Sequence, residues 1–264
     1  MAETQTKPRV AVHKFSSCDG CQLALLNLGE ALLDLTERVE LIHFAEAGLL
    51  GAEEQVDIAF IEGSVTTPGE AKRILNIRQQ SKVLITIGAC ATSGGIQALR
   101  NQADGAAWMA EIYPSPQFID TLATSTAIAE HVRVDFEIWG CPINGQQIID
   151  VVKAALFGVA PLAQHDKLCL DCKRQGRVCV MVTQGEPCMG PVTNTGCGSL
   201  CPSVGRGCFA CYGPAENANA TGLVNRFQGL GLVKQEIAQR LLFINNNAEP
   251  FASVGQALKD SCDD

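Results

Sequence analysis

Short β-branched apolar runs alternate with longer stretches of helical spacing over the first 160 or so residues. In each longer stretch the apolar residues recur every three or four positions, which is typical of an amphipathic helix. This alternation predicts a parallel sheet whose strands are joined by crossover helices. We therefore expect a flavodoxin-like, doubly wound α/β domain over residues 1–160. Strands are expected at residues 9–15, 39–44, 56–61, 83–87 and 132–139, and helices at residues 22–35, 70–80 and 146–157.

The sequence pattern of the chain changes after about residue 160. Residues 167–213 contain eight cysteines, many glycines and prolines, and no sustained helical or strand periodicity. Such a segment has too little apolar patterning to fold on a core of its own, so metal coordination is the obvious candidate for holding it. Farther on, residues 230–243 have the spacing of one apolar helix. We expect residues 161–264 to form an irregular second domain whose tail packs on the rest or contacts a partner.

Composition and charge exclude several classes of function. The 264 residues carry 20 basic and 28 acidic side chains, and the net charge of −8 argues against a nucleic-acid partner. The longest nearly apolar stretch, residues 154–163, is broken by Gly158 and Pro161 and is far shorter than the roughly 20 residues of a membrane span. The start of the chain is polar and resembles neither a secretory nor a twin-arginine signal. These features predict a cytoplasmic protein without a membrane span.

Thirteen cysteines are the main candidates for chemistry. In a reducing cytoplasm, thiols seldom form lasting disulfides and more often hold metal or do redox chemistry. Cys18 and Cys21 follow the first predicted strand, Cys90 the fourth and Cys141 the fifth. Because the carboxyl ends of parallel strands meet at one edge of a sheet, these four thiols can surround one cubane iron–sulfur cluster. Zinc ligands and ordinary buried cysteines remain alternatives, although structural zinc usually uses two close ligand pairs.

Eight more cysteines fall into two groups of four with nearly mirrored spacing. The first group is spaced C-x2-C-x6-C-x8-C and the second C-x3-C-x6-C-x2-C. Cys262 is left over near a polar terminus and is most simply a free thiol. The glycines around Cys90 do not spell G-x-G-x-x-G, so we place neither flavin nor nicotinamide on this chain.

Several short motifs together resemble the small, electron-transferring subunit of nickel–iron hydrogenases. They are Cys18-Asp19-Gly20-Cys21-Gln22, Glu62-Gly63-Ser64, Gly88-Ala89-Cys90-Ala91, Gly140-Cys141-Pro142, Cys188-Met189-Gly190-Pro191-Val192-Thr193 and Cys208-Phe209-Ala210-Cys211. The resemblance extends from Val10 to Pro214. It implies a cytoplasmic member of that family, similar to sulfhydrogenase delta subunits, whose diaphorase partners couple hydrogen to NAD(P).

The resemblance also implies the ligands of three 4Fe-4S clusters. The proximal cluster would be bound by Cys18, Cys21, Cys90 and Cys141, the medial by Cys197, Cys201, Cys208 and Cys211, and the distal by Cys169, Cys172, Cys179 and Cys188. Periplasmic relatives often hold the medial cluster with three cysteines, so the fourth thiol of Cys201 implies a 4Fe-4S cluster of lower potential. Those relatives begin the distal motif with histidine. Here Cys169 takes that place, His165 is the alternative ligand, and Cys179 departs from the family spacing.

By the same resemblance, this chain does not activate hydrogen itself. In the family, nickel is bound by two C-x2-C pairs of the large subunit, and no pair here has that placement. We expect the nickel–iron centre on a large-subunit partner, and FAD with 2Fe-2S or 4Fe-4S clusters on flavin diaphorase partners that bind NAD(P). Glu62, beside the predicted proximal cluster, could relay protons or touch an iron, or could simply cap the next turn. A complex I-like iron–sulfur subunit is the competing assignment, but that subunit has adjacent cysteines at the first motif and lacks the eight-cysteine half.

Overall fold

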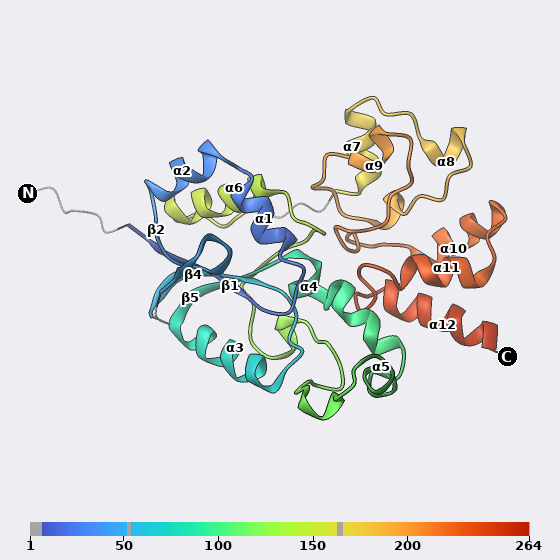
Figure 1. Ribbon diagram of the computed structural model, residues 1–264. Coiled ribbons are helices and arrows are strands. Elements are labelled where there is room, and N and C mark those ends of the chain that lie inside the picture. Colours follow the sequence, from blue (N-terminus) through green and yellow to red (C-terminus); the bar gives the residue numbers. More distant parts are fainter. Residues whose placement is uncertain (1–6, 52–53, 163–165, 264) are drawn as a thin grey trace, which may run out of the picture.

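A computed structural model describes residues 7–51, 54–162 and 166–263 (Figure 1). Its centre is a six-stranded sheet in the order β3-β2-β1-β4-β5-β6, parallel except for β3. Without β3, this is the strand order of flavodoxin-like folds, so the predicted fold class is confirmed. The strands are β1 (Arg9–Lys14), β2 (Glu40–Phe44), β3 (Leu49–Leu50), β4 (Val56–Glu62), β5 (Ser81–Ile87) and β6 (Phe136–Ile138).

All five predicted strands are present, but the two edges of the sheet differ from the prediction. The last strand, β6, has three residues instead of the eight predicted over residues 132–139. Val132 and Val134 pack against the core beneath the sheet instead of joining the ladder. The sequence did not predict β3, because its two leucines are exposed and too few to show a periodicity.

Helices cover both faces of the sheet. Successive side chains of β1 and β4 point to opposite faces of the sheet. On one face they form a core under α1, α2 and α6, and on the other a core under α3 (Figure 1). The predicted helix over residues 22–35 is in fact two helices, because the backbone of Gly29 has φ +57° and separates them. The helices are α1 (Gly20–Leu26), α2 (Glu30–Thr36), α3 (Pro68–Gln80) and α6 (Gly145–Leu156).

The chain between β5 and β6 forms short helices that the sequence did not predict. The first of them, α4, follows β5 directly and carries Cys90. The others mostly lack the long apolar spacing that would reveal a helix in the sequence. These elements are α4 (Gly88–Ser93), η2 (Gly95–Gln102), α5 (Gly105–Ile112), η3 (Pro116–Phe118) and η4 (Ile128–Glu130), while η1 (Ala45–Ala47) follows β2.

The last third of the chain consists of loops and short helices that share a third core. Leu168, Val180 and Val192 pack there with Phe227 and Phe251. The cysteine-rich segment shares its apolar core with helices farther along the chain, a contribution that the sequence did not predict. The elements are α7 (Leu168–Arg174), α8 (Val180–Thr183), η5 (Gly190–Val192), α9 (Leu200–Ser203), α10 (Ala220–Gly229), α11 (Lys234–Leu241) and α12 (Phe251–Asp263).

In this part of the chain, one predicted helix is shorter than expected and another helix was not predicted. The helix predicted over residues 230–243 is shorter, because Gly231 has φ +93° and α11 begins only at Lys234. The sequence did not predict α12.

A domain boundary near residue 160 stays a prediction. None of the helices in the described ranges is long and apolar enough to cross a membrane.

Candidate metal centres

The first set of cysteines (Cys18, Cys21, Cys90 and Cys141) comes from three loops at the carboxyl end of the sheet. Cys18 lies in the loop after β1, Cys21 in the first turn of α1, Cys90 in α4 and Cys141 just after β6. Burial, followed by the Cys141 and Cys18 thiols, raises the pKa of Cys90 to about 11. Burial also raises the pKa of Cys21, to which Glu62, Cys90 and Cys141 contribute. The four thiols therefore lie within electrostatic reach of one another.

Glycines let the backbone approach these sulfur atoms closely. Gly88 has φ +86°, and a Cβ placed on it would lie 2.4 Å from Cys21 Sγ. A Cβ on Gly20 would lie 3.3 Å from Cys18 Sγ. At Gly88 a side chain would both strain the backbone and occupy the space next to the thiol, so this position requires glycine.

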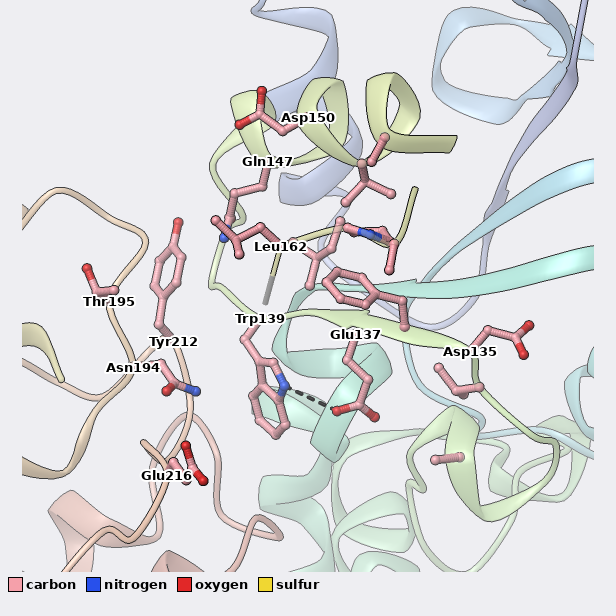
Figure 2. A pocket seen from close by; sticks show the side chains of 18 of the residues that line it. Asp135, Glu137, Trp139, Gln147, Asp150, Leu162, Asn194, Thr195, Tyr212 and Glu216 are labelled. Atoms are coloured by element: carbon pink, nitrogen blue, oxygen red, sulfur yellow. Dashed lines mark hydrogen bonds between the residues drawn. The ribbon is translucent and has the colours of Figure 1, made fainter. Parts of the chain in front are cut away.

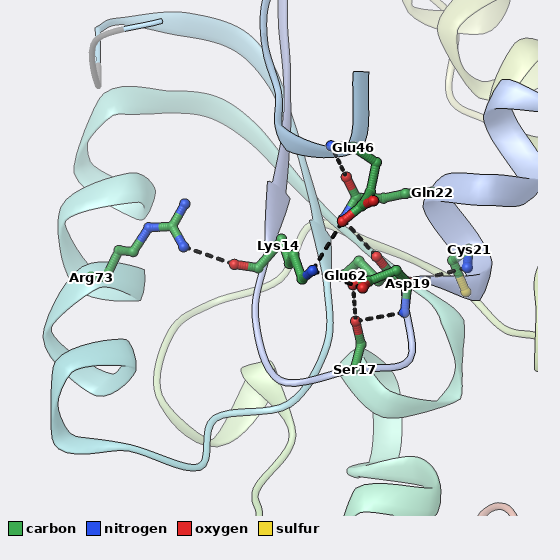
Figure 3. A network of polar contacts seen from close by, with 8 residues as sticks. All are labelled: Lys14, Ser17, Asp19, Cys21, Gln22, Glu46, Glu62 and Arg73. Carbon is green, nitrogen blue, oxygen red and sulfur yellow. Dashed lines mark hydrogen bonds and ion pairs between the residues drawn. The ribbon is translucent and has the colours of Figure 1, made fainter. Parts of the chain in front are cut away.

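Glu62 ends β4 and is buried, with 2% of its surface exposed. Its Oε1 accepts a hydrogen bond of 3.0 Å from the backbone N–H of Cys21, and its Oε2 accepts one of 2.7 Å from Gln22 Nε2 (Figure 3). Burial raises the pKa of this carboxyl group, although both hydrogen bonds oppose the rise. The expectation that Glu62 caps its own next turn is wrong: it caps α1 and orients Cys21. Contact with an iron and proton relay stay predictions.

A charged network holds the loop that contains Cys18. Lys14 Nζ donates to Asp19 Oδ2 at 2.7 Å and to Glu46 Oε1 at 2.9 Å (Figure 3). Asp19 has φ +64°, and its other oxygen accepts a hydrogen bond of 3.0 Å from Ser17 Oγ. The motifs recognised in the sequence include Asp19 but not Lys14, Ser17 or Glu46. The signal available was a lysine at the end of the strand that precedes the Cys18 loop.

The second set of cysteines (Cys169, Cys172, Cys179 and Cys188) surrounds α7. Cys169 and Cys172 lie on α7, Cys179 immediately precedes α8, and Cys188 lies just before η5. A Cβ on Gly190 would lie 3.4 Å from Cys188 Sγ and 3.5 Å from Cys169 Sγ, so these two sulfur atoms face a common space. Burial, then the thiols of Cys188, Cys172 and Cys179, raises the pKa of Cys169 to about 11. The structure thus brings all four together.

The third set (Cys197, Cys201, Cys208 and Cys211) lies on α9 and in the loops around it. Burial, then the thiols of Cys197, Cys141 and Cys201, raises the pKa of Cys211 to about 12. Burial and the neighbouring Cys197 also raise the pKa of Cys201. These shifts place Cys211 among its own set and also near Cys141 of the first set.

The three sets follow one another in space in the order first, third, second. Cys211 provides the link to the first set through Cys141. The backbone N–H of Cys208 donates a hydrogen bond of 3.2 Å to Cys188 Sγ, which links the third set to the second. Cys208 Sγ in turn accepts a hydrogen bond of 3.3 Å from the N–H of Ala210. The third set therefore lies between the other two.

Two further predicted residues lie outside these sets. His165, the alternative ligand, is outside the described residues. Cys262 falls within α12, and its character as a free thiol stays a prediction.

The donor chemistry of the three sets fits iron–sulfur clusters. Burial raises the pKa of thiols in each set, which disfavours a bare thiolate, whereas a coordinating cation holds the sulfur deprotonated. In the described ranges, no three or more His, Cys, Asp or Glu side chains are grouped so as to hold a metal ion. The thiolates of a cubane bind four separate irons and stand farther apart than the ligands of one zinc ion. Four thiols in each set match the four cysteine ligands of a cubane cluster.

A cleft of about 1060 Å³ opens beside β6 (Figure 2). Trp139, Glu137 and Tyr212 are among its lining residues, and Trp139 Nε1 donates to Glu137 Oε2 at 3.2 Å. Trp139 packs against Gly213, where a Cβ would lie 2.2 Å from the indole Cε3. None of the cysteines of the three sets lines the cleft. Its walls instead support the loops that carry Cys141 and the third set.

Comparisons with known proteins identify the family of the chain. The family model described as NADH ubiquinone oxidoreductase, 20 Kd subunit, matches residues 18–155, just over half of the chain. Sulfhydrogenase 2 subunit delta of Pyrococcus furiosus is 33% identical over 233 residues, which cover 88% of this chain and 97% of that protein. The HoxS delta subunit of the NAD-reducing hydrogenase of Cupriavidus necator is 30% identical over 172 residues, covering 60% of this chain and 82% of that protein.

Solved structures extend the comparison to the fold. A chain of an NAD⁺-reducing [NiFe]-hydrogenase in the H2-reduced state is 26% identical, with a TM-score of 0.54, and the match covers 60% of this chain and 95% of that chain. A chain of the actinobacterial-type NiFe-hydrogenase from Ralstonia eutropha is 16% identical and shows likeness of fold alone, with a TM-score of 0.57 over 98% of this chain and 92% of that chain. The chain therefore belongs to the family described as the 20 Kd subunit of NADH ubiquinone oxidoreductase, and within it is a small-subunit-like protein of nickel–iron hydrogenases, an oxidoreductase that works as part of a complex.

Proposed function

We propose that this chain passes electrons between the nickel–iron centre of a large catalytic subunit and a flavin diaphorase that binds NAD(P), through three 4Fe-4S clusters. The spatial order of the cysteine sets carries the proposal. The third set contacts the first near Cys141 and the second at Cys188, so the three form one row. In this proposal the first set holds the proximal cluster, the third the medial and the second the distal. The clusters supply one-electron chemistry when bound.

The two ends of the row are suited to different partners. Cys18 of the first set is exposed at the carboxyl end of the sheet, where ligands bind in open α/β folds. This end faces the large subunit in our proposal. At the other end, Cys179 is exposed, and Val178 and Val182 beside it are 68% and 75% exposed. In our proposal these exposed apolar side chains contact the diaphorase, so this end faces that partner.

Positive charge near the distal end supports cluster binding there. Lys173 lowers the pKa of the Cys169 thiol and thereby opposes the effect of burial. Arg206 has the same effect on Cys201 of the third set. A cubane with four thiolates carries net negative charge, which nearby cations stabilise.

The names of relatives support the pyridine-nucleotide link and also suggest a second candidate. HoxS, a relative over 60% of this chain, is named as an NAD-reducing hydrogenase. A vhu chain of the F420-non-reducing hydrogenase from Methanococcus voltae is 27% identical over 281 residues, covering 95% of this chain and 98% of that protein. A hydrogenase subunit serving an acceptor other than NAD(P) is therefore the second candidate. A complex I-like role is less well supported, since the eight cysteines of the second and third sets lie beyond the residues that the family model matches.

The test uses the complex purified without oxygen and the variant Cys172→Ser, which removes one thiol of the second set. We expect hydrogen-dependent reduction of NAD⁺ or NADP⁺ to be lost, while H/D exchange, which needs only the large subunit, continues. The control is Cys262→Ser, which removes the cysteine outside the three sets and should leave both activities unchanged. Full nucleotide reduction by Cys172→Ser would contradict the proposal. Hydrogen-dependent reduction of some other acceptor, with none of NAD⁺ or NADP⁺ by the parent complex, would favour the second candidate.

A further inference from the structure

Two consecutive asparagines after α11 are buried where the last third of the chain meets α4. Asn245 is 2% exposed and Asn246 is 3% exposed. Buried amide side chains are uncommon and persist where their hydrogen bonds are satisfied. Neither residue belongs to a motif that the sequence analysis singled out.

Asn245 bridges the element that carries Cys90 and the loop that carries the third set. Its Oδ1 accepts a hydrogen bond of 2.8 Å from Ser93 Oγ, and Ser93 is the last residue of α4. Its Nδ2 donates a hydrogen bond of 2.7 Å to the backbone oxygen of Ala210. One side chain thus joins two segments that are far apart in the sequence.

Both ends of this bridge act on cysteine positions. Ala210 lies between Cys208 and Cys211, has φ +57°, and donates its N–H to Cys208 Sγ. A non-glycine residue with positive φ is strained and persists only where surrounding contacts hold it. The hydrogen bond from Asn245 is such a contact. Ser93 lies three residues after Cys90, on the same short helix.

We propose that Asn245 is a positioning residue that fixes the separation of the first and third cysteine sets, and with it the electronic coupling between the clusters they hold. This inference rests on the proposed function, because it requires clusters at both sets. The bridge is buried, so water does not compete for either hydrogen bond. A shorter or longer link would move the Cys208–Cys211 loop relative to α4, and electron transfer falls steeply with distance.

Asn246 offers a matched control. It is equally buried, and its Nδ2 donates to the backbone oxygens of Gly95 at 2.9 Å and Phe243 at 3.0 Å, while its Oδ1 has no hydrogen-bond partner among the described residues. These contacts hold the turn against η2 but do not reach the Cys208–Cys211 loop. A variant at Asn246 therefore disturbs the same junction without releasing the third set.

The experiment compares Asn245→Leu, Asn245→Asp and Asn246→Leu in the complex purified without oxygen. Iron and acid-labile sulfide are counted first. The magnetic splitting between the reduced clusters is then measured by electron paramagnetic resonance after reduction with hydrogen. We expect Asn245→Leu to change the splitting and to slow hydrogen-dependent acceptor reduction several-fold, whereas Asn246→Leu keeps the splitting of the parent complex.

Asn245→Asp separates positioning from folding. An ionised carboxylate keeps the volume and accepts from Ser93 but cannot donate to the oxygen of Ala210, so the spectrum is recorded at high pH, where the buried group is ionised. If Asn245→Leu loses iron, Asn245→Asp decides the question, and we expect its splitting to change as well. A splitting equal to that of the parent complex in Asn245→Asp would overturn the inference. Absence of iron from the parent complex would instead overturn the proposed function.

Discussion

Replacement of Gly88 by alanine tests whether the first set of cysteines binds a cluster. The new Cβ would lie 2.4 Å from Cys21 Sγ, whereas non-bonded heavy atoms are most stable about 3.5–4.0 Å apart. Either the sulfur or α4 must therefore move by about 1 Å. Metal–ligand distances tolerate only about 0.2 Å, so this shift is several times larger than a cluster ligand can accept.

The same substitution should leave the fold intact. Holding a non-glycine residue at φ +86° costs about 1–2 kcal/mol, and a domain is typically stable by about 5–15 kcal/mol. We therefore expect the Gly88→Ala protein to fold and to lose the proximal cluster. The iron count should fall from about twelve to about eight per chain.

The assay is an iron and acid-labile sulfide count on protein purified without oxygen, together with circular dichroism to confirm the fold. The matched control is Gly105→Ala, because a Cβ at Gly105 meets nothing within 4 Å. That variant should keep all of its iron. A Gly88→Ala protein with the iron content and paramagnetic spectrum of the parent would refute the reasoning.

Substitutions at Gly213, Cys201 and Glu137 test other contacts of the chain. Gly213→Ala should lower the free energy of unfolding by about 2–4 kcal/mol in denaturant titrations, since it combines positive φ with a clash against Trp139. The control Gly176→Ala has positive φ but no neighbour within 4 Å, so its free energy of unfolding should fall by only about 1–2 kcal/mol. Equal losses would show that the Trp139 contact is unimportant. Cys201→Ala leaves three thiols in the third set and should give a 3Fe-4S signal in oxidised protein; an unchanged 4Fe-4S spectrum would remove Cys201 from the ligands. Burial raises the pKa of Glu137, so the folded chain holds this proton to higher pH than the unfolded chain, and stability is lost as pH rises through the folded pKa. The melting temperature of Glu137→Gln should therefore rise relative to that of the parent as pH increases from about 4 to 8. A difference between the two melting temperatures that does not change with pH would contradict this.

The parts of the fold visible in the sequence are those set by local periodicity. β1 and β4 are buried along nearly their whole length and form short, almost continuous apolar runs, so these strands could be predicted closely. The break at Gly29 was missed because a glycine inside an apolar helical pattern is compatible with a continuous helix. The short β6 was overestimated because Val132 and Val134 look like strand residues but pack on a core instead.

In the candidate site, too, some features could be predicted from the sequence and others could not. Cysteines at strand ends could be placed at one edge because the topology of a parallel sheet brings those ends together. The contacts of Glu62 and Asn245 could not be predicted, since their partners lie far away in the sequence. Glu62 binds Cys21, 41 residues earlier, and Asn245 binds Ser93, 152 residues earlier. Such polar pairs carry no periodic signal and are visible only in three dimensions.

The most direct test of the central claim is a count of iron, acid-labile sulfide, zinc and nickel in the native complex purified without oxygen. Three four-iron clusters require about twelve irons and about twelve sulfides per copy of this chain, with nickel in a co-purifying large subunit. Zinc in place of iron would contradict the account. Iron without nickel would support electron transfer through the three clusters but would assign the chain to a different enzyme.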